Sequence, residues 1–177
     1  MHAICRQGRS WRGGCLVDAG ADMSAAQVRL ATALDHTAVK SLYRELRPHD
    51  PEVSEEASLA HFRSVLDSPQ VRLVVALSDG EVGATCMLAC IPNFASAGMP
   101  IGVVEHVITA TRFRRRGLAF AALQFALDEA WAMNCCMVFL LSGVQRNEAH
   151  RLYELAGFAG NQELGFVKKN PSLLRHD

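Results

Sequence analysis

The chain lacks a net charge, because eighteen Lys and Arg side chains balance eighteen Asp and Glu side chains. A global field that would attract nucleic acid, an anionic membrane or an acidic partner is therefore excluded. Aromatic residues make up only 7% of the chain, which leaves few rings to stack on nucleic-acid bases. Apolar runs such as residues 137–141 are far shorter than the roughly 20 residues of a membrane-spanning helix. A charged binding site can therefore be inferred only from a local cluster of like charges in the sequence.

The chain has six cysteines, but their spacing predicts neither a disulfide framework nor a metal site. Cys135 and Cys136 are adjacent, Cys86 and Cys90 lie inside an apolar run, and no secretory segment precedes them. The Cys86-x3-Cys90 pair has no His or Cys partner at zinc-ligand spacing. We expect reduced packing thiols in a cytoplasmic protein without a metal. A nucleophilic thiol at Cys135 or Cys136 is the remote alternative.

What the chain does have is enough apolar sequence for one compact domain, since half of its 177 residues are apolar. Residues 1–22 contain Arg and Gly but no periodic apolar pattern, so we expect a flexible N-terminal extension there and a single domain over residues 23–177. A start placed too early, with Met23 as the natural beginning, and an organelle transit peptide are the alternatives.

Apolar periodicity from residue 27 onward predicts alternating strands and helices. Asp35 stands at an N-cap position, Asp79-Gly80 is a strong hairpin signal, and Gly157 is a helix stop. Strands are expected at residues 27–32, 71–77, 82–91, 102–109, 137–141 and 164–168, and helices at residues 35–46, 54–66, 117–133 and 148–156. This order predicts an α/β domain in which helices pack on a mixed sheet.

The local concentration of positive charge lies in TRFRRRGLA, residues 111–119, where a predicted strand leads into a predicted helix. Backbone N–H groups at a helix start have no intrahelical partner and attract anions, and Gly117 and Ala119 allow a ligand to approach closely. Arginines on the same loop add donors for phosphate oxygens. The stretch therefore favours a diphosphate site. A solvated basic loop and a nucleic-acid patch or localisation signal are the alternatives.

Two motifs resemble those of one family. Arg114-Arg115-Arg116-Gly117-Leu118-Ala119 is similar to the Q/R-x-x-G-x-G/A loop of the GNAT superfamily of acyl-CoA-dependent N-acyltransferases, with Ala119 in place of the second glycine. Residues 147–158, NEAHRLYELAGF, resemble the family's N-x-x-A-x-x-x-Y-x-x-x-G-F segment, with one residue fewer between Asn147 and Ala149. The order of elements agrees over residues 27–166. The resemblance implies the GNAT fold: a mixed, mostly antiparallel sheet splayed at the central strand, with helices on both faces.

The resemblance also implies a cosubstrate, acetyl-CoA, and the residues that hold it. The backbone of Val107, Ile108 and Thr109 would pair with the pantetheine arm, to which Asn147 would also donate a hydrogen bond. Tyr153 would place its hydroxyl beside the sulfur as proton donor. The amides around the CoA diphosphate would be those of Arg114, Arg115, Arg116, Gly117, Leu118 and Ala119. Homodimers are common in the family.

Glu105 is the candidate general base, because it is an acidic residue in a strand otherwise made of Val and Ile. A buried or half-buried carboxylate there would be a better base than a solvated one. Glu105-His106 resembles the Glu-Asp pair that glucosamine-6-phosphate N-acetyltransferases have in this strand. The two side chains point to opposite faces unless a bulge intervenes, and a bulge would free the N–H of Val107 or Ile108 for the carbonyl oxygen.

Each candidate also has an ordinary structural explanation. Glu105 could form an ion pair or face outward, Tyr153 could be a core aromatic, and Asn147 could be only an N-cap. We expect an N-acetyltransferase that moves acetyl from acetyl-CoA to a small primary amine in a ternary complex, with residues 47–51 and 92–100 beside the acceptor. A non-catalytic acyl-CoA sensor, a protein N-acetyltransferase and a nucleic-acid module are the competing interpretations.

Overall fold

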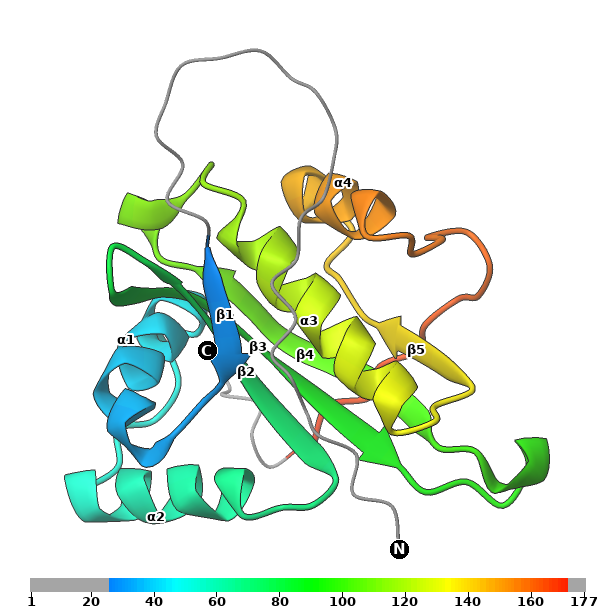
Figure 1. Ribbon diagram of the computed structural model, residues 1–177, viewed down its shortest axis with the longest axis horizontal. Coiled ribbons are helices and arrows are strands. Elements are labelled where there is room, and N and C mark those ends of the chain that lie inside the picture. The colour runs from blue at the N-terminus through cyan, green and yellow to red at the C-terminus, as the bar shows by residue number, and fades with distance from the viewer. Residues whose placement is uncertain (1–25, 172–177) are drawn as a thin grey trace, which may run out of the picture.

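The computed structural model describes residues 26–171, and these form one five-stranded sheet with the strand order β1-β2-β3-β4-β5 (Figure 1). The pairs β1-β2, β2-β3 and β3-β4 are antiparallel, and the pair β4-β5 is parallel. The strands are β1 (Gln27–Leu30), β2 (Val71–Ser78), β3 (Glu81–Ile91), β4 (Ile101–Thr109) and β5 (Met137–Leu140). The mixed, mostly antiparallel sheet is confirmed. The expected extension at residues 1–22 lies outside the described residues.

Helices cover both faces of the sheet (Figure 1). On one face lie α1 (His36–Leu46) and α2 (Glu55–Leu66), and on the other lies α3 (Leu118–Ala132), which contacts β2, β3 and β4. The last helix, α4 (Asn147–Leu155), follows β5. All four helices were predicted from the sequence within two residues at each end. None of the helices among the described residues is long and apolar enough to cross a membrane.

The core is divided by the sheet because successive side chains of a strand point to opposite faces. In β2, Val74 and Ala76 pack in the cluster under α3, while Leu73, Val75 and Leu77 pack in the cluster under α1 and α2. The β2–β3 hairpin turns at Asp79 and Gly80, both with positive φ of 55° and 79°. Two left-handed residues are what a tight hairpin turn requires, so the Asp-Gly signal is confirmed.

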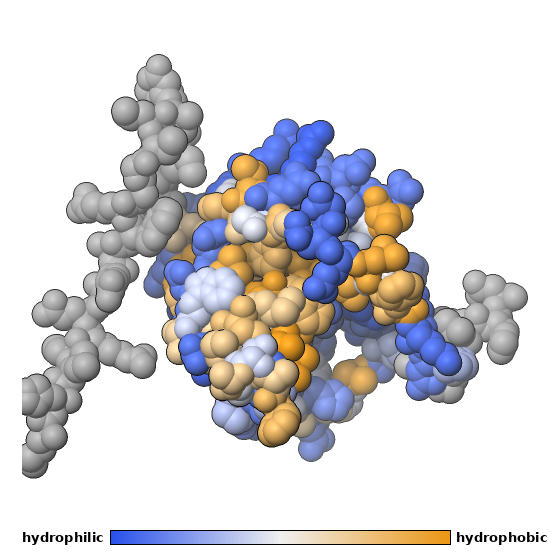
Figure 2. Space-filling view, turned by 90° about the vertical axis from the view of Figure 1, so that its right-hand side faces the viewer, coloured by the Kyte–Doolittle hydropathy of each residue, from blue (hydrophilic) through white to orange (hydrophobic). Residues whose placement is uncertain are grey.

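The predicted last strand at residues 164–168 is wrong. The chain has no regular secondary structure there, and Leu164, Phe166 and Val167 are exposed. Gly165 interrupts the apolar run and Lys168 and Lys169 end it, so the segment has little side-chain surface with which to hold a strand against the sheet. The outer edge of β5 therefore has no strand partner among the described residues. Apolar residues lie on the surface of this side of the molecule (Figure 2), and those of β5 include Met137 and Phe139.

Candidate active site

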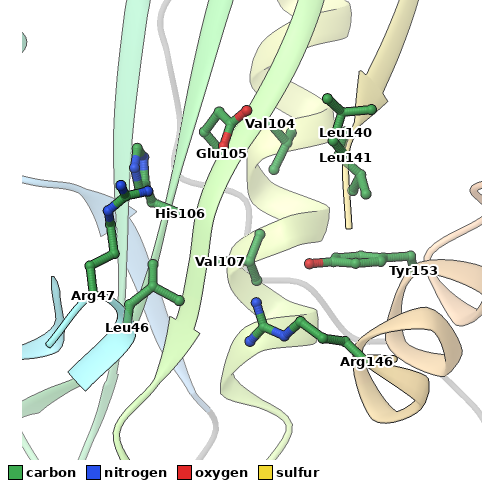
Figure 3. Close-up of a pocket in the computed structure, with 10 residues that line it drawn as sticks. All are labelled: Leu46, Arg47, Val104, Glu105, His106, Val107, Leu140, Leu141, Arg146 and Tyr153. Carbon is green, nitrogen blue, oxygen red and sulfur yellow. The ribbon is translucent and has the colours of Figure 1, made fainter. Parts of the chain in front are cut away.

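The candidate site begins where β4 and β5 stop pairing. The register runs from Ile101 opposite Met137 to Val104 opposite Leu140, and β4 then continues to Thr109 paired with β3 but no longer with β5. A cavity of about 220 Å³ lies at this divergence (Figure 3). Its walls are Leu46, Arg47, Val104, Glu105, His106, Val107, Leu140, Leu141, Arg146 and Tyr153. The separation leaves one edge of β4 without a strand partner beside the cavity.

A bulge in β4 shapes the cavity. Met87 of β3 pairs with Glu105 and Thr85 pairs with Ile108, so two β4 residues lie opposite one residue of β3. His106 has a φ of 55°, which is the left-handed conformation that side chains other than glycine adopt only under constraint. The expected bulge is confirmed. Because of it, Glu105 and His106 line the same cavity instead of facing opposite sides of the sheet.

Glu105 is exposed, so the expectation of a buried or half-buried carboxylate is wrong. The reason is the divergence itself, because the pairing with β5 ends at Val104, one residue before Glu105. No ion pair involves Glu105 among the described residues, which leaves its carboxylate available to a ligand in the cavity.

Tyr153 reaches the cavity from α4, and its hydroxyl points toward β4 (Figure 3). The end of α4 fixes its position: Phe158 N–H donates to Tyr153 O at 3.0 Å, Gly157 has a φ of 92°, and the Phe158 ring packs edge-on against the Tyr153 ring at 6.3 Å. This is the Schellman arrangement that a Gly-Phe pair after a helix produces. Burial raises the pKa of Tyr153 although Arg146 opposes the shift, so the phenol keeps its proton at neutral pH.

His106 lies against α1 through a ring contact with Tyr43, with centroids 5.1 Å apart. The Tyr43 hydroxyl and the His106 Nδ1 are both buried without a hydrogen-bond partner. Burial raises the pKa of Tyr43, so this hydroxyl is neutral. Buried polar atoms without a hydrogen-bond partner are unusual in a folded protein.

The arginine loop leads into α3 through two left-handed residues, Arg115 with φ 62° and Gly117 with φ 75°. The first bond of the helix is donated by Ala121 to Gly117 O at 3.0 Å, so the amides of Leu118, Ala119 and Phe120 have no acceptor inside the helix. These amides form the anion-attracting helix start that the sequence predicts.

Two of the four arginines have structural contacts with the β2–β3 hairpin. Arg112 forms an ion pair with Glu81 at 2.7 Å, and Arg116 forms one with Asp79 at 3.0 Å. Both guanidinium groups lie over the ring of the buried Phe113, at 4.8 and 5.2 Å from its centroid. Part of the local positive charge therefore holds the loop to the hairpin, while Arg114 and Arg115 are exposed.

Asn147 is the first residue of α4 and is exposed. The residue in the N-cap position is Arg146, so the interpretation of Asn147 as an N-cap is wrong. Sequence reasoning missed Arg146 and Leu141 as cavity residues, and its only available signal was their closeness to Asn147 and β5 in the chain. Arg47 lines the cavity as expected, whereas the loop at residues 92–100 does not.

Metal and thiol chemistry have no support in the described part of the chain. It holds no group of three or more His, Cys, Asp or Glu side chains that could bind a metal ion. Cys86, Cys90 and Cys135 are buried as predicted, and burial raises the pKa of Cys86 and of Cys90 to about 12. These two thiols stay protonated at neutral pH and are poor nucleophiles. Neither Cys135 nor Cys136, the remote nucleophile alternative, lines the cavity.

Comparison with known proteins places the sequence in a family. The model of the acetyltransferase (GNAT) family matches residues 25–158. The chain belongs to the GNAT family. A protein of Agrobacterium tumefaciens strain C58, described as an acetyltransferase, is 32% identical with a TM-score of 0.76, and the match covers 81% of this chain and 99% of that one. No curated protein sequence matched.

Two further GNAT structures share the fold at lower identity. Glucosamine-6-phosphate N-acetyltransferase from Arabidopsis thaliana is 21% identical with a TM-score of 0.73, covering 82% of this chain and 99% of that chain. An aminoglycoside N-acetyltransferase solved in complex with CoA is 18% identical with a TM-score of 0.70, covering 87% and 99%. The resemblance read from the two motifs is thus confirmed at the level of the GNAT fold and family.

Proposed function

We propose that this GNAT protein is an N-acetyltransferase that moves the acetyl group of acetyl-CoA to the primary amine of a small molecule. The observation that carries the proposal is the opening between β4 and β5, with the Tyr153 hydroxyl directed at the β4 bulge across it (Figure 3). The helix start at Gly117 follows β4 directly in the chain, so one continuous segment offers both a free strand edge and a set of free amides.

The cosubstrate fits the chain through main-chain groups. The unpaired edge of β4 at Val107, Ile108 and Thr109 suits the amides and carbonyls of a pantetheine arm. The free amides before Ala121, together with those of the loop from Arg114, suit a diphosphate. Asn147 is exposed at the start of α4 and follows Arg146, which lines the cavity, so its amide would donate a hydrogen bond to the same arm.

The side chains divide the chemistry between the two walls. Glu105 binds the acceptor ammonium and draws its proton away, directly or through water, so that the neutral amine attacks the carbonyl carbon. The bulged backbone at Val107 or Ile108 directs an N–H at the carbonyl oxygen as it gains charge. Tyr153, neutral because burial raises its pKa, protonates the departing sulfur.

Direct transfer is favoured over a relay through the enzyme. No cysteine of the described residues lines the cavity, and the buried thiols of Cys86 and Cys90 have pKa values near 12. A cavity of about 220 Å³ suits a small acceptor beside the thioester rather than a folded protein surface. Both substrates would therefore be bound at once.

A panel of amines tests the proposal: glucosamine 6-phosphate, kanamycin, spermidine, lysine and a peptide with a free N-terminus, each with acetyl-CoA and detection of released thiol. We expect turnover with at least one small amine. In Tyr153→Phe, kcat should fall about 100-fold while the Kd for CoA measured by calorimetry stays within about twofold. CoA binding without turnover of any amine would identify a sensor, and turnover of the peptide alone would identify a protein acetyltransferase.

A further inference from the structure

The imidazole of His106 has no structural explanation in the fold. The residue holds a left-handed backbone conformation with φ 55°, which an Asn or Gly would adopt at lower cost. Strained residues of this kind concentrate at functional sites, where surrounding contacts hold them in place. The ring contact with Tyr43 of α1 is the contact that fixes the imidazole.

The two ring nitrogens of His106 have different surroundings. Nδ1 is buried without a hydrogen-bond partner beside the equally unpaired Tyr43 hydroxyl, so Nε2 is the nitrogen left to the cavity that the residue lines. In the tautomer that carries its proton on Nδ1, the Nε2 lone pair faces the cavity.

Two charged side chains line the cavity beside this ring. Glu105 is the neighbouring residue, and Arg47 lies on the α1 side of the cavity (Figure 3). Tyr43 is neutral because burial raises its pKa. Histidine is the side chain that exchanges a proton most readily near neutral pH. Glu105 is exposed to solvent, so water competes with it for the ammonium proton.

We propose that His106 is a further catalytic residue of the transfer and that it, in place of Glu105, receives the acceptor's proton. Glu105 holds the ammonium at the bulge; its N–H bond breaks as a new N–H bond forms at His106 Nε2. The amine lone pair that this step releases attacks the carbonyl carbon, and the imidazolium is left beside the Glu105 carboxylate. The inference rests on the acetyltransferase function proposed above and changes one role in it: Glu105 binds the ammonium and His106 accepts its proton.

The variant that tests this proposal is His106→Gly, because glycine adopts a φ of 55° without strain and so preserves the bulge. With acetyl-CoA and the panel amine that gives the highest wild-type rate, kcat/KM should fall about 100-fold at pH 7. Added free imidazole should restore much of that loss, since it can occupy the vacated space and accept the proton. His61→Gln, at an exposed position of α2, is the matched control and should keep the wild-type rate.

A second variant separates chemistry from folding. His106→Asn keeps a polar side chain that tolerates the left-handed conformation but cannot accept a proton, so the decline of kcat/KM at acidic pH should disappear or move. Loss of activity that imidazole cannot rescue, or an unchanged rate and pH profile in both variants, would overturn the role of His106 while leaving the acetyltransferase intact. If the wild type acetylates no amine of the panel, the proposed function fails and this inference falls with it.

Discussion

At the scale of single residues, the position of Tyr153 depends on the two residues that end its helix. Gly157 supplies the left-handed turn, and Phe158 then packs edge-on against the Tyr153 ring. The spacing between Tyr153 and Gly157-Phe158 in the motif is therefore needed for this ring packing, and it is also a feature of the family motif. The sequence predicted the residue and its helix, but its rotamer follows from a ring contact that periodicity does not encode.

Phe158→Ala should loosen Tyr153 without removing its hydroxyl. We expect kcat to fall about tenfold, because a proton donor that is poorly held loses catalytic alignment. KM for acetyl-CoA should change less, since the main chain of β4 and α3 is untouched. Steady-state kinetics check the prediction, with Leu155→Ala as a control at an exposed position of the same helix. Equal losses in both variants would point to general destabilisation of α4.

Asp35 is the residue with the clearest electrostatic contribution to stability. Its buried carboxylate accepts hydrogen bonds from Arg29 at 2.7 and 2.9 Å and from Thr32 N and Oγ1 at 2.7 and 2.9 Å. The bond from Arg29 is the main cause that holds the pKa of Asp35 below its ordinary value. The sequence predicted Asp35 at the helix start, but its side chain closes the turn before α1 instead of capping α1 itself.

Asp35→Asn should lower the free energy of unfolding by about 2 kcal/mol at pH 7, as charge-assisted hydrogen bonds are lost. A carboxylate with a lowered folded pKa stabilises the protein above its unfolded value of about 4, and this contribution disappears as pH falls through the folded value. Urea unfolding at pH 7 and near pH 3 measures the difference between wild type and variant. A difference that stays constant across this range would contradict the assignment.

At the scale of elements, the start of α3 shows why one glycine matters. Gly117 has a φ of 75°, and a Cβ built there meets no atom within 4 Å, so a side chain at this position would cost backbone strain alone. Arg112 and Arg116 hold the same loop to Glu81 and Asp79 of the hairpin. The sequence predicted the anion-binding helix start, whereas the hairpin contacts depend on elements about 35 residues apart.

Gly117→Ala should destabilise the protein by about 1 kcal/mol through the left-handed conformation. It should also weaken CoA binding, because relaxing this strain rotates the amides of the helix start. Calorimetry with CoA and thermal unfolding measure the two effects. Gly160→Ala, at another open position but without a positive φ, is the control and should change neither.

At the scale of the whole molecule, the sequence predicted the family, the order of the elements up to α4 and the bulge. It did not predict the irregular conformation of residues 164–168. The last strand was predicted because its apolar residues have the period of a strand. The prediction was wrong because Gly165 and the two lysines weaken the segment, and sequence reasoning identified no neighbouring strand for it. Glu105 was expected to be buried because its neighbours are apolar, yet exposure depends on where β5 stops. Both errors concern the outer edge of the sheet, where long-range geometry decides.

The uncovered edge of β5 makes the homodimer that the resemblance implies a testable prediction. Met137 and Phe139 are exposed on this strand, and edge strands with free backbone groups readily pair with a second chain. Analytical ultracentrifugation should detect a dimer, and Phe139→Lys should shift the equilibrium toward monomer. A monomer at all concentrations would contradict the predicted dimer and would leave the proposed active site unchanged.

Where β4 and β5 diverge, the proposed donor and acceptor would be recognised by different kinds of atoms. The wall proposed for acetyl-CoA consists largely of peptide groups, which every sequence supplies, whereas the acceptor end is bordered by side chains such as Arg47, Glu105 and His106. Mutation can thus change the side chains at the acceptor end while the main-chain groups that bind acetyl-CoA stay the same. A new amine preference could evolve here by a few exchanges around the bulge, with the donor kept constant.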